Sequence, residues 1–128
     1  MQPTPDDIAL HDRARAAAAN AYAGYSGFSV GAALQAASGA VHLGVNVENG
    51  SYGLTCCAER TAVFAAVTAG EREFVTIAVY ADAASTPPCG ACRQVLAEFA
   101  PGLRVVWQRG GELVVTPLAE LLPEPFEL

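Results

Sequence analysis

Four residues in the middle of the chain carry the side chains that metal-assisted hydrolysis needs. Cys57 and Glu59 stand close together, and a Pro-Cys-x-x-Cys arrangement with Cys89 and Cys92 follows further along the chain. Three thiolate ligands would leave the fourth position of a zinc ion open, as catalytic zinc sites require. The carboxylate of Glu59 would then be free to carry protons for a metal-bound water. The spacing therefore predicts a catalytic zinc site.

Two other interpretations of the cysteines account for fewer residues. A thioredoxin-like redox pair would use Cys89 and Cys92 but would leave Cys57 and Glu59 without a role. A structural four-cysteine zinc site would need Cys56, and adjacent residues rarely reach the same ion. Such a structural module is the non-enzymatic alternative, and it requires four protein ligands and no metal-bound water.

Histidines could act as further zinc ligands, and arginines could offset the charge of the predicted site. His11 is expected in a helix and His42 in a hairpin strand, and both are more often surface or packing residues than ligands. Three thiolates would leave a zinc site net negative, which opposes deprotonation of a bound water. Arg60 is the better candidate to offset this charge by hydrogen bonding to sulfur, with Arg93 second, although either could form a surface ion pair.

The side chains at positions i and i+2 of a regular helix point to different sides. Glu59 can therefore converge with Cys57 only if Cys57 lies in an irregular first turn of the helix.

Length and composition favour one compact domain over residues 1–128. Hydrophobic residues make up 52% of the chain and the mean hydropathy is +0.29, so we expect self-association to cover apolar surface. A net charge of −6 without basic clusters argues against a nucleic-acid partner. The start of the chain lacks a signal-peptide pattern and no long apolar run occurs, which predicts no membrane partner and a cytoplasmic location. Thiols stay reduced there.

The hydrophobic pattern predicts an α/β fold of helices and strands in the order α-β-β-α-β-α-β-β-α. Helices are expected from the Thr4 cap to residue 22 and over residues 57–69, 90–99 and 118–122, and strands over residues 30–36, 41–47, 74–80, 103–108 and 113–116. Such an order predicts a three-layer α/β/α sandwich around a five-stranded mixed sheet. The last two strands must be antiparallel because their link is too short for a parallel crossover. The helix over residues 57–69 is apolar on most faces, which predicts burial all round.

Five segments of the chain, in order and in register, resemble the small homotetrameric cytidine deaminases. They are YSGFSVGAA at residues 25–33, NVENGSY at 46–52, CAERTA at 57–62, PCGACRQ at 88–94 and LLPEPF at 121–126. The resemblance covers nearly the whole chain and implies a cytidine deaminase-like fold. The final segment is followed by a tail shorter than the usual one in this family.

The resemblance implies a role for each matching residue. The implied roles are binding of one zinc ion per subunit for Cys57, Cys89 and Cys92, proton transfer for Glu59, substrate binding for Phe28, Asn46, Glu48, Tyr52, Ala58 and Phe126, and support of the zinc thiolates for Arg60. Asn46 and Glu48 would bind a ribose hydroxyl, and Phe28 would pack against the pyrimidine. Tyr52 and Phe126 would complete the pocket of a neighbouring subunit. The structural alternatives are a turn at the hairpin end, a core phenylalanine and a local cap of the chain.

The implied activity is zinc-dependent hydrolytic deamination of cytidine and deoxycytidine to uridine and deoxyuridine plus ammonia, in pyrimidine salvage. The implied assembly is a homotetramer. A rival substrate is another aminopyrimidine nucleoside, as in the blasticidin S deaminases, but the segment Asn46-Val47-Glu48-Asn49 favours the plain nucleoside. Deamination within nucleic acid is disfavoured by the negative net charge and by the short link at Gly110-Gly111.

Overall fold

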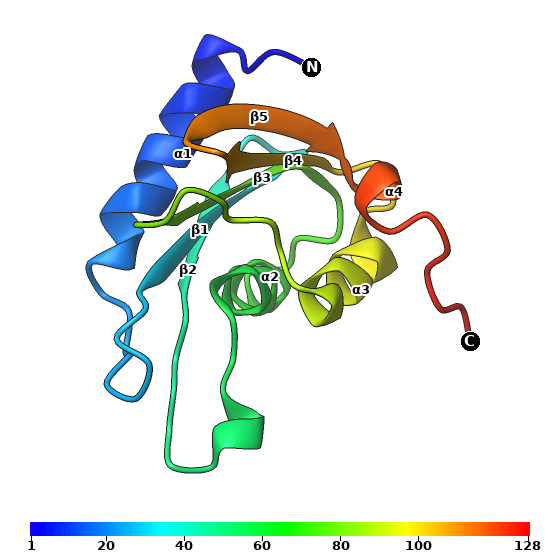
Figure 1. The fold of residues 1–128 in the computed structure, drawn as a ribbon. Helices are drawn as coiled ribbons and strands as arrows, with labels where there is room; N and C mark the ends of the chain where they lie inside the picture. Colours follow the sequence, from blue (N-terminus) through cyan, green and yellow to red (C-terminus); the bar gives the residue numbers. More distant parts are fainter.

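The apolar segments assemble into one five-stranded mixed sheet with helices on both faces (Figure 1). The computed structural model describes all residues 1–128. The helices are α1 (Pro5–Ala18), α2 (Ala58–Thr68), α3 (Gly90–Phe99) and α4 (Leu118–Leu121), with a 3-10 turn η1 (Tyr52–Leu54). The strands are β1 (Val30–Ala36), β2 (Val41–Val45), β3 (Phe74–Ala81), β4 (Arg104–Arg109) and β5 (Glu112–Pro117). The predicted fold class is therefore confirmed.

The order of strands in the sheet is β2-β1-β3-β4-β5. Only β3 and β4 are parallel, and α3 lies in the crossover between them, as a parallel pair requires. The pair β4–β5 is antiparallel and its register ends at Arg109 opposite Glu112, so the predicted hairpin is confirmed. No helix of the chain has the length and apolarity that a membrane crossing needs.

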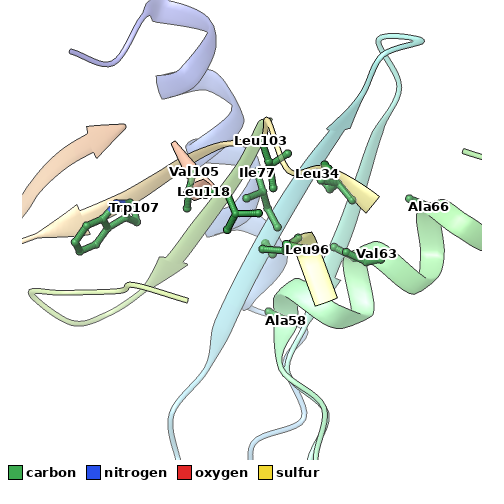
Figure 2. Packing of buried hydrophobic residues seen from close by; sticks show 13 residues of the cluster. Leu34, Ala58, Val63, Ala66, Ile77, Leu96, Leu103, Val105, Trp107 and Leu118 are labelled. Carbon is green, nitrogen blue, oxygen red and sulfur yellow. The ribbon is translucent and has the colours of Figure 1, made fainter. Parts of the chain in front are cut away.

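Each face of the sheet has its own hydrophobic core, because successive residues of a strand point to opposite faces. Leu34 and Ile77 belong to the core beneath α2 and α3, where Val63 and Leu96 are also buried (Figure 2). Their neighbours in sequence belong instead to a second cluster beneath α1. That cluster comprises Leu10, Ala14, Ala33, Ala78, Val106 and Val115. The sheet, with α1 on one face and α2 and α3 on the other, therefore forms a three-layer sandwich.

Two glycines allow the helices to lie directly on the sheet. A Cβ atom at Gly31 would come 1.9 Å from the backbone oxygen of Ala14 in α1. A Cβ atom at Gly44 in β2 would come 2.3 Å from the backbone oxygen of Ala58 in α2, which is closer than atoms can pack. Gly44 therefore sets the height of the first turn of α2 above the sheet.

The start of α1 is fixed by polar contacts. The Thr4 hydroxyl accepts a hydrogen bond from the Asp7 amide at 3.2 Å, and the Asp7 carboxylate accepts one from the Thr4 amide at 2.9 Å. Arg104 on β4 donates two further hydrogen bonds to Asp7, at 2.7 and 2.8 Å. The predicted Thr4 cap is confirmed, and the ion pair ties the helix to the start of β4.

Two predicted element ends are wrong for one shared reason. Helix α1 ends at Ala18 rather than Tyr22, and β2 ends at Val45 rather than Val47. Tyr22 and Val47 form an isolated parallel bridge, and Val47 also pairs with Cys56. Long-range pairing therefore takes both residues out of the regular elements that their local sequence favours.

The prediction that α2 is buried all round is also wrong for the single chain. Val63 and Ala66 face the core, whereas Phe64 is 51% exposed and Ala65 is exposed. Only one side of the helix meets the sheet, so its outer side carries apolar surface.

Candidate active site

Three cysteines from two helix starts meet in space. Cys57 precedes α2 and Cys89 precedes α3, both with extended backbone, and Cys92 lies in the first turn of α3. Their sulfur atoms all lie within 4.8 Å of one another. Because Cys57 stands before the regular helix, the condition for it to converge with Glu59 is met, as predicted.

Cys57 is the cysteine of the cluster whose surroundings favour negative charge. The Cys92 thiol and the Arg60 guanidinium both hydrogen-bond to Cys57 and lower its pKa to about 5. Arg60 donates through Nη2 to the Cys57 sulfur at 3.2 Å. The same Cys57 contact, together with burial, raises the pKa of Cys92. The Cys89 sulfur accepts a hydrogen bond from the Cys92 amide at 3.4 Å, at the start of α3.

Glu59 lies in the first turn of α2, and only 4% of its surface is exposed. Burial raises its pKa above the usual value of a glutamate, and the charge of Cys57 acts in the same direction. A raised pKa moves a carboxyl group toward the range in which a general acid and base works. Glu59 therefore has the environment of a proton carrier.

A cavity of about 330 Å³ opens beside these residues. Two sets of residues from different parts of the fold line it. The helix-end group comprises Cys57, Ala58, Glu59 and Cys89, and the loop group comprises Ser26, Phe28, Asn46 and Glu48. A third part of the lining comes from the segment 85–87, between β3 and α3. The volume falls in the range of small-molecule sites in proteins.

Glu48 holds the loop that precedes β1. Its Oε1 accepts hydrogen bonds from the backbone amides of Tyr25 at 3.0 Å and Ser26 at 2.9 Å. The Ser26 hydroxyl donates to Oε2. These contacts, led by the Ser26 hydroxyl, lower the pKa of Glu48, so the carboxylate is ionised at neutral pH.

Asn46 holds the next part of the same loop. Its Oδ1 accepts a hydrogen bond from the Val30 amide at 2.9 Å, and its Nδ2 donates one to the Phe28 carbonyl at 2.8 Å. The Phe28 ring is 46% exposed and lines the cavity. The structure thus brings Phe28, Asn46 and Glu48, which stand far from the cysteines in sequence, to the cavity that Cys57 and Glu59 line.

Comparisons with known proteins agree with this geometry. A family model described as the cytidine and deoxycytidylate deaminase zinc-binding region matches residues 4–108. Cytidine deaminase of Halalkalibacterium halodurans is 51% identical over 109 residues, which cover 83% of each chain. The chain belongs to the cytidine deaminase family. The resemblance stated from the sequence motifs is thereby confirmed.

Solved structures of the cytidine deaminase family share the fold. The cytidine deaminase of Burkholderia pseudomallei has a TM-score of 0.89 and 51% identity, with 93% of this chain and 98% of that chain covered. The cytidine deaminase of Mycobacterium tuberculosis has a TM-score of 0.84 and 38% identity, covering 98% and 100%. The overlap includes the sheet and its helices, so the site described above rests on the family's framework.

The cysteine cluster fits the zinc ion of the cytidine deaminase family. Tetrahedral zinc–thiolate bonds of ~2.3 Å place two sulfurs about 3.8 Å apart, and the observed separations stay within 4.8 Å. The fourth cysteine, Cys56, is outside the cluster, and its backbone pairs with Val47 instead. Three protein ligands leave one position for a reacting molecule, which the structural four-cysteine alternative would not.

The two arginines have different partners. Arg60 donates to the Cys57 sulfur, as preferred on sequence grounds. Arg93 donates instead to the carbonyl oxygens of Pro88 and Leu121, both at 2.7 Å. Arg93 therefore fixes the approach to Cys89 and the end of α4, whereas Arg60 acts on the charge of the cluster.

Tyr52 and Phe126 lie outside the cavity of their own chain. Tyr52 is 72% exposed on η1, with its ring edge-on to Tyr25 at 5.4 Å. Phe126 is 70% exposed, and Gln94 holds its backbone through two hydrogen bonds of 2.9 Å. Their role in a neighbouring subunit's pocket stays a prediction.

The sequence interpretation missed Ser26 and the segment 85–87. Ser26 lies within a matching motif, so its hydroxyl could have been considered. Thr86 could not be found from spacing, because its position depends on the β4–β5 hairpin. Its hydroxyl accepts a hydrogen bond from the Gln108 amide, and Gln108 Nε2 donates to the Ala83 carbonyl, both at 2.9 Å. The Gly111 amide donates to the Ala84 carbonyl at 2.8 Å, so the hairpin shapes this part of the cavity.

Proposed function

We propose that this chain catalyses the hydrolytic deamination of cytidine and deoxycytidine to uridine and deoxyuridine, releasing ammonia. One observation carries the proposal. A buried carboxyl group, Glu59, and two members of the three-cysteine cluster, Cys57 and Cys89, line the same cavity as the paired polar side chains of Asn46 and Glu48. The first set suits metal-assisted hydrolysis, and the second suits a sugar hydroxyl.

The three-cysteine cluster and the Glu59 and Ala58 residues of the helix-end group divide the chemistry. Cys57, Cys89 and Cys92 would hold the zinc ion, which supplies an activated water near neutral pH. Glu59 takes a proton from the attacking water and delivers it to ring nitrogen 3. The hydroxide bonds to ring carbon 4. Glu59 then takes the proton of the new hydroxyl on carbon 4 and passes it to the amino group, so that the carbon–nitrogen bond breaks, ammonia leaves and a carbonyl remains. The Ala58 amide, at the unpaired start of α2, donates a hydrogen bond to the 2-oxo group.

The loop group has room for one sugar hydroxyl. A carboxylate offers about four lone-pair positions, and Glu48 already uses three of them within the loop. Asn46 has one N–H left after its bond to the Phe28 carbonyl. A single hydroxyl can accept from Asn46 and donate to Glu48. We infer that this hydroxyl is one that ribose and deoxyribose share, so that both nucleosides bind.

The proposal includes a homotetramer of single catalytic domains spanning residues 1–128. Apolar side chains on the outer surface support the self-association, and they are Phe64, Leu54, Tyr52 and Phe126. In this assembly Tyr52 and Phe126 complete a neighbour's cavity. We place the enzyme in the cytoplasm, since its four cysteines are free and its cluster requires reduced thiols. The proposed reaction places it in pyrimidine salvage.

One assay tests the proposal. The zinc-loaded protein is mixed with cytidine, deoxycytidine, another aminopyrimidine nucleoside or a cytosine-containing single-stranded oligonucleotide, and loss of cytosine absorbance and release of ammonia are followed. We expect turnover of the first two, loss of activity with a chelator, and recovery with zinc. Turnover of the oligonucleotide alone, or of no free nucleoside, would overturn the proposal. Light scattering during gel filtration tests the tetramer.

A further inference from the structure

The hydroxyl of Ser26 makes two hydrogen bonds to different parts of the site. It donates to Oε2 of Glu48, and it accepts from the amide of Phe28 at 3.0 Å. Ser26 also lines the cavity. One small side chain thus contacts both the carboxylate proposed for the sugar and the backbone that carries the ring proposed for the base.

The contact fixes the orientation of the Glu48 carboxylate. Oε1 is already occupied by the amides of Tyr25 and Ser26, at 3.0 and 2.9 Å. With the Ser26 hydroxyl on Oε2, one acceptor direction remains for a ligand. Glu48 is 7% exposed, so bulk water cannot freely replace a lost partner.

The contact also fixes the turn that presents Phe28. Gly27, between the two residues, has a φ of 71°, in the left-handed region. Nothing lies within 4 Å of the position of a Cβ atom at Gly27, so no other group packs against this point of the turn. Hydrogen bonds hold the turn on both sides: the Gly27 amide donates to the Ala23 carbonyl at 2.8 Å, and the Phe28 amide donates to the Ser26 hydroxyl.

We propose that Ser26 is a positioning residue that couples sugar recognition by Glu48 to the placement of Phe28 over the base. The inference rests on the proposed nucleoside substrate. A hydroxyl that only formed a local turn would need the Phe28 amide alone. The donation to a buried carboxylate on a different segment gives it the second function.

The direct test is the variant Ser26→Ala, with Ser26→Thr as the conservative variant. We expect Ala to raise KM for cytidine about tenfold with little change in kcat, because a hydrogen bond to a charged group is lost away from the reacting atoms. Thr keeps the hydroxyl and should stay close to wild type. Ser29→Ala is the matched control, since Ser29 is an exposed serine of the same loop and its side chain makes no hydrogen bond.

Substrate dissection separates coupling from simple loop damage. 2′,3′-Dideoxycytidine lacks the 2′ and 3′ hydroxyls, including the 3′ hydroxyl that cytidine and deoxycytidine share, so the KM penalty of Ser26→Ala should shrink to about threefold, which reflects Phe28 alone. In a Glu48→Gln background the penalty for cytidine should shrink similarly. Equal penalties for both substrates, or an equal loss in Ser29→Ala, would contradict the coupling.

Two controls keep the outcomes distinct. Thermal unfolding and zinc content of the Ser26→Ala protein should match wild type. If the Ala variant is unstable, Ser26→Cys, with a similar volume and a weaker donor, takes its place. Failure of the wild type to deaminate cytidine overturns the proposed function, whereas normal wild-type turnover with an unchanged KM in the variants overturns only the role of Ser26.

Discussion

The two groups that line the cavity are built in different ways. The helix-end group stands at the starts of α2 and α3, where the attached helices and the close packing of α2 against the sheet hold it. The loop group stands on irregular segments next to β1 and β2, where Asn46 and Glu48 hold the chain by side-chain hydrogen bonds. The difference suggests that chemistry is fixed by the fold itself, whereas recognition depends on a few polar side chains. Changes in the two groups should therefore separate into effects on kcat and on KM.

Removal of the metal should have the largest effect on the helix-end group. A chelator that strips the thiolate cluster should abolish turnover, and zinc should restore it. Magnesium should not, because hard cations prefer oxygen ligands to thiolates. The measurement is cytidine turnover against metal content. Restoration by magnesium would contradict the assignment of the cluster.

The substitution Glu59→Gln should have the second largest effect on activity. The amide fills a similar volume but cannot shuttle a proton, so kcat should fall by about 10³-fold while KM changes little. Zinc content should match wild type, which shows that the ligands are intact. A Gln variant with normal kcat would remove the proton-carrier role and with it the contrast between the two groups.

Arg60→Ala should lower zinc affinity about tenfold, because the Cys57 thiolate loses a hydrogen-bond donor and its pKa rises. Arg93→Ala is the matched control, since Arg93 contacts carbonyl oxygens and not the sulfur of Cys57. Competition with a chromophoric chelator measures both affinities. Equal losses in the two variants would contradict a specific role for Arg60.

Asn46→Ala should raise KM about tenfold, with a smaller change in kcat. The amide of Val30 and the carbonyl of Phe28 each lose a partner, so the loop becomes less ordered as the hydroxyl contact is lost. Steady-state kinetics with cytidine and deoxycytidine measure the effect. A fall in kcat with unchanged KM would show that the loop group belongs to the chemistry.

The smallest effect on activity is expected far from both groups, at Asp7. The hydrogen bond from Arg104 lowers the pKa of Asp7 below that of the unfolded chain. The resulting stability is present above the ordinary carboxyl pKa of about 4 and is lost as the pH falls through the lower folded value. Asp7→Asn should cost about 1–2 kcal/mol at neutral pH and flatten this part of the pH dependence, with kcat and KM unchanged. Urea unfolding from pH 3 to pH 7 measures it, and an equal pH dependence in both proteins would exclude Asp7 as the source.

Local patterns predicted most of this fold. The alternation in β1, the Thr4 cap and the glycine turn of the β4–β5 hairpin all act through neighbours in sequence. The ends of α1 and β2 were wrong because Tyr22 and Val47 pair with each other across a long loop. The exposed side of α2 was missed because apolar composition does not distinguish a buried helix face from an exposed apolar one.

The site residues also separate into those that local sequence predicts and those that long-range contacts place. The residues around Cys57 and Cys89 were predicted because their spacing is itself the chemical signal. Asn46 and Glu48 were expected from resemblance, but their bonds to the Phe28 loop were visible only in three dimensions. Thr86 had no local signal, since its place in the cavity comes from Gln108 on a distant strand.

The attachment of the segment 83–87 to the β4–β5 hairpin has a consequence for protein design. Residues 109–112 form the hairpin turn, and Gly110 and Gly111 donate to Ser85 and Ala84. Variation of turn length or sequence would therefore reshape one part of the cavity while the cysteine ligands and the Phe28 loop keep their own supports. A library restricted to this turn offers a way to select altered nucleobase preference with the catalytic machinery left intact.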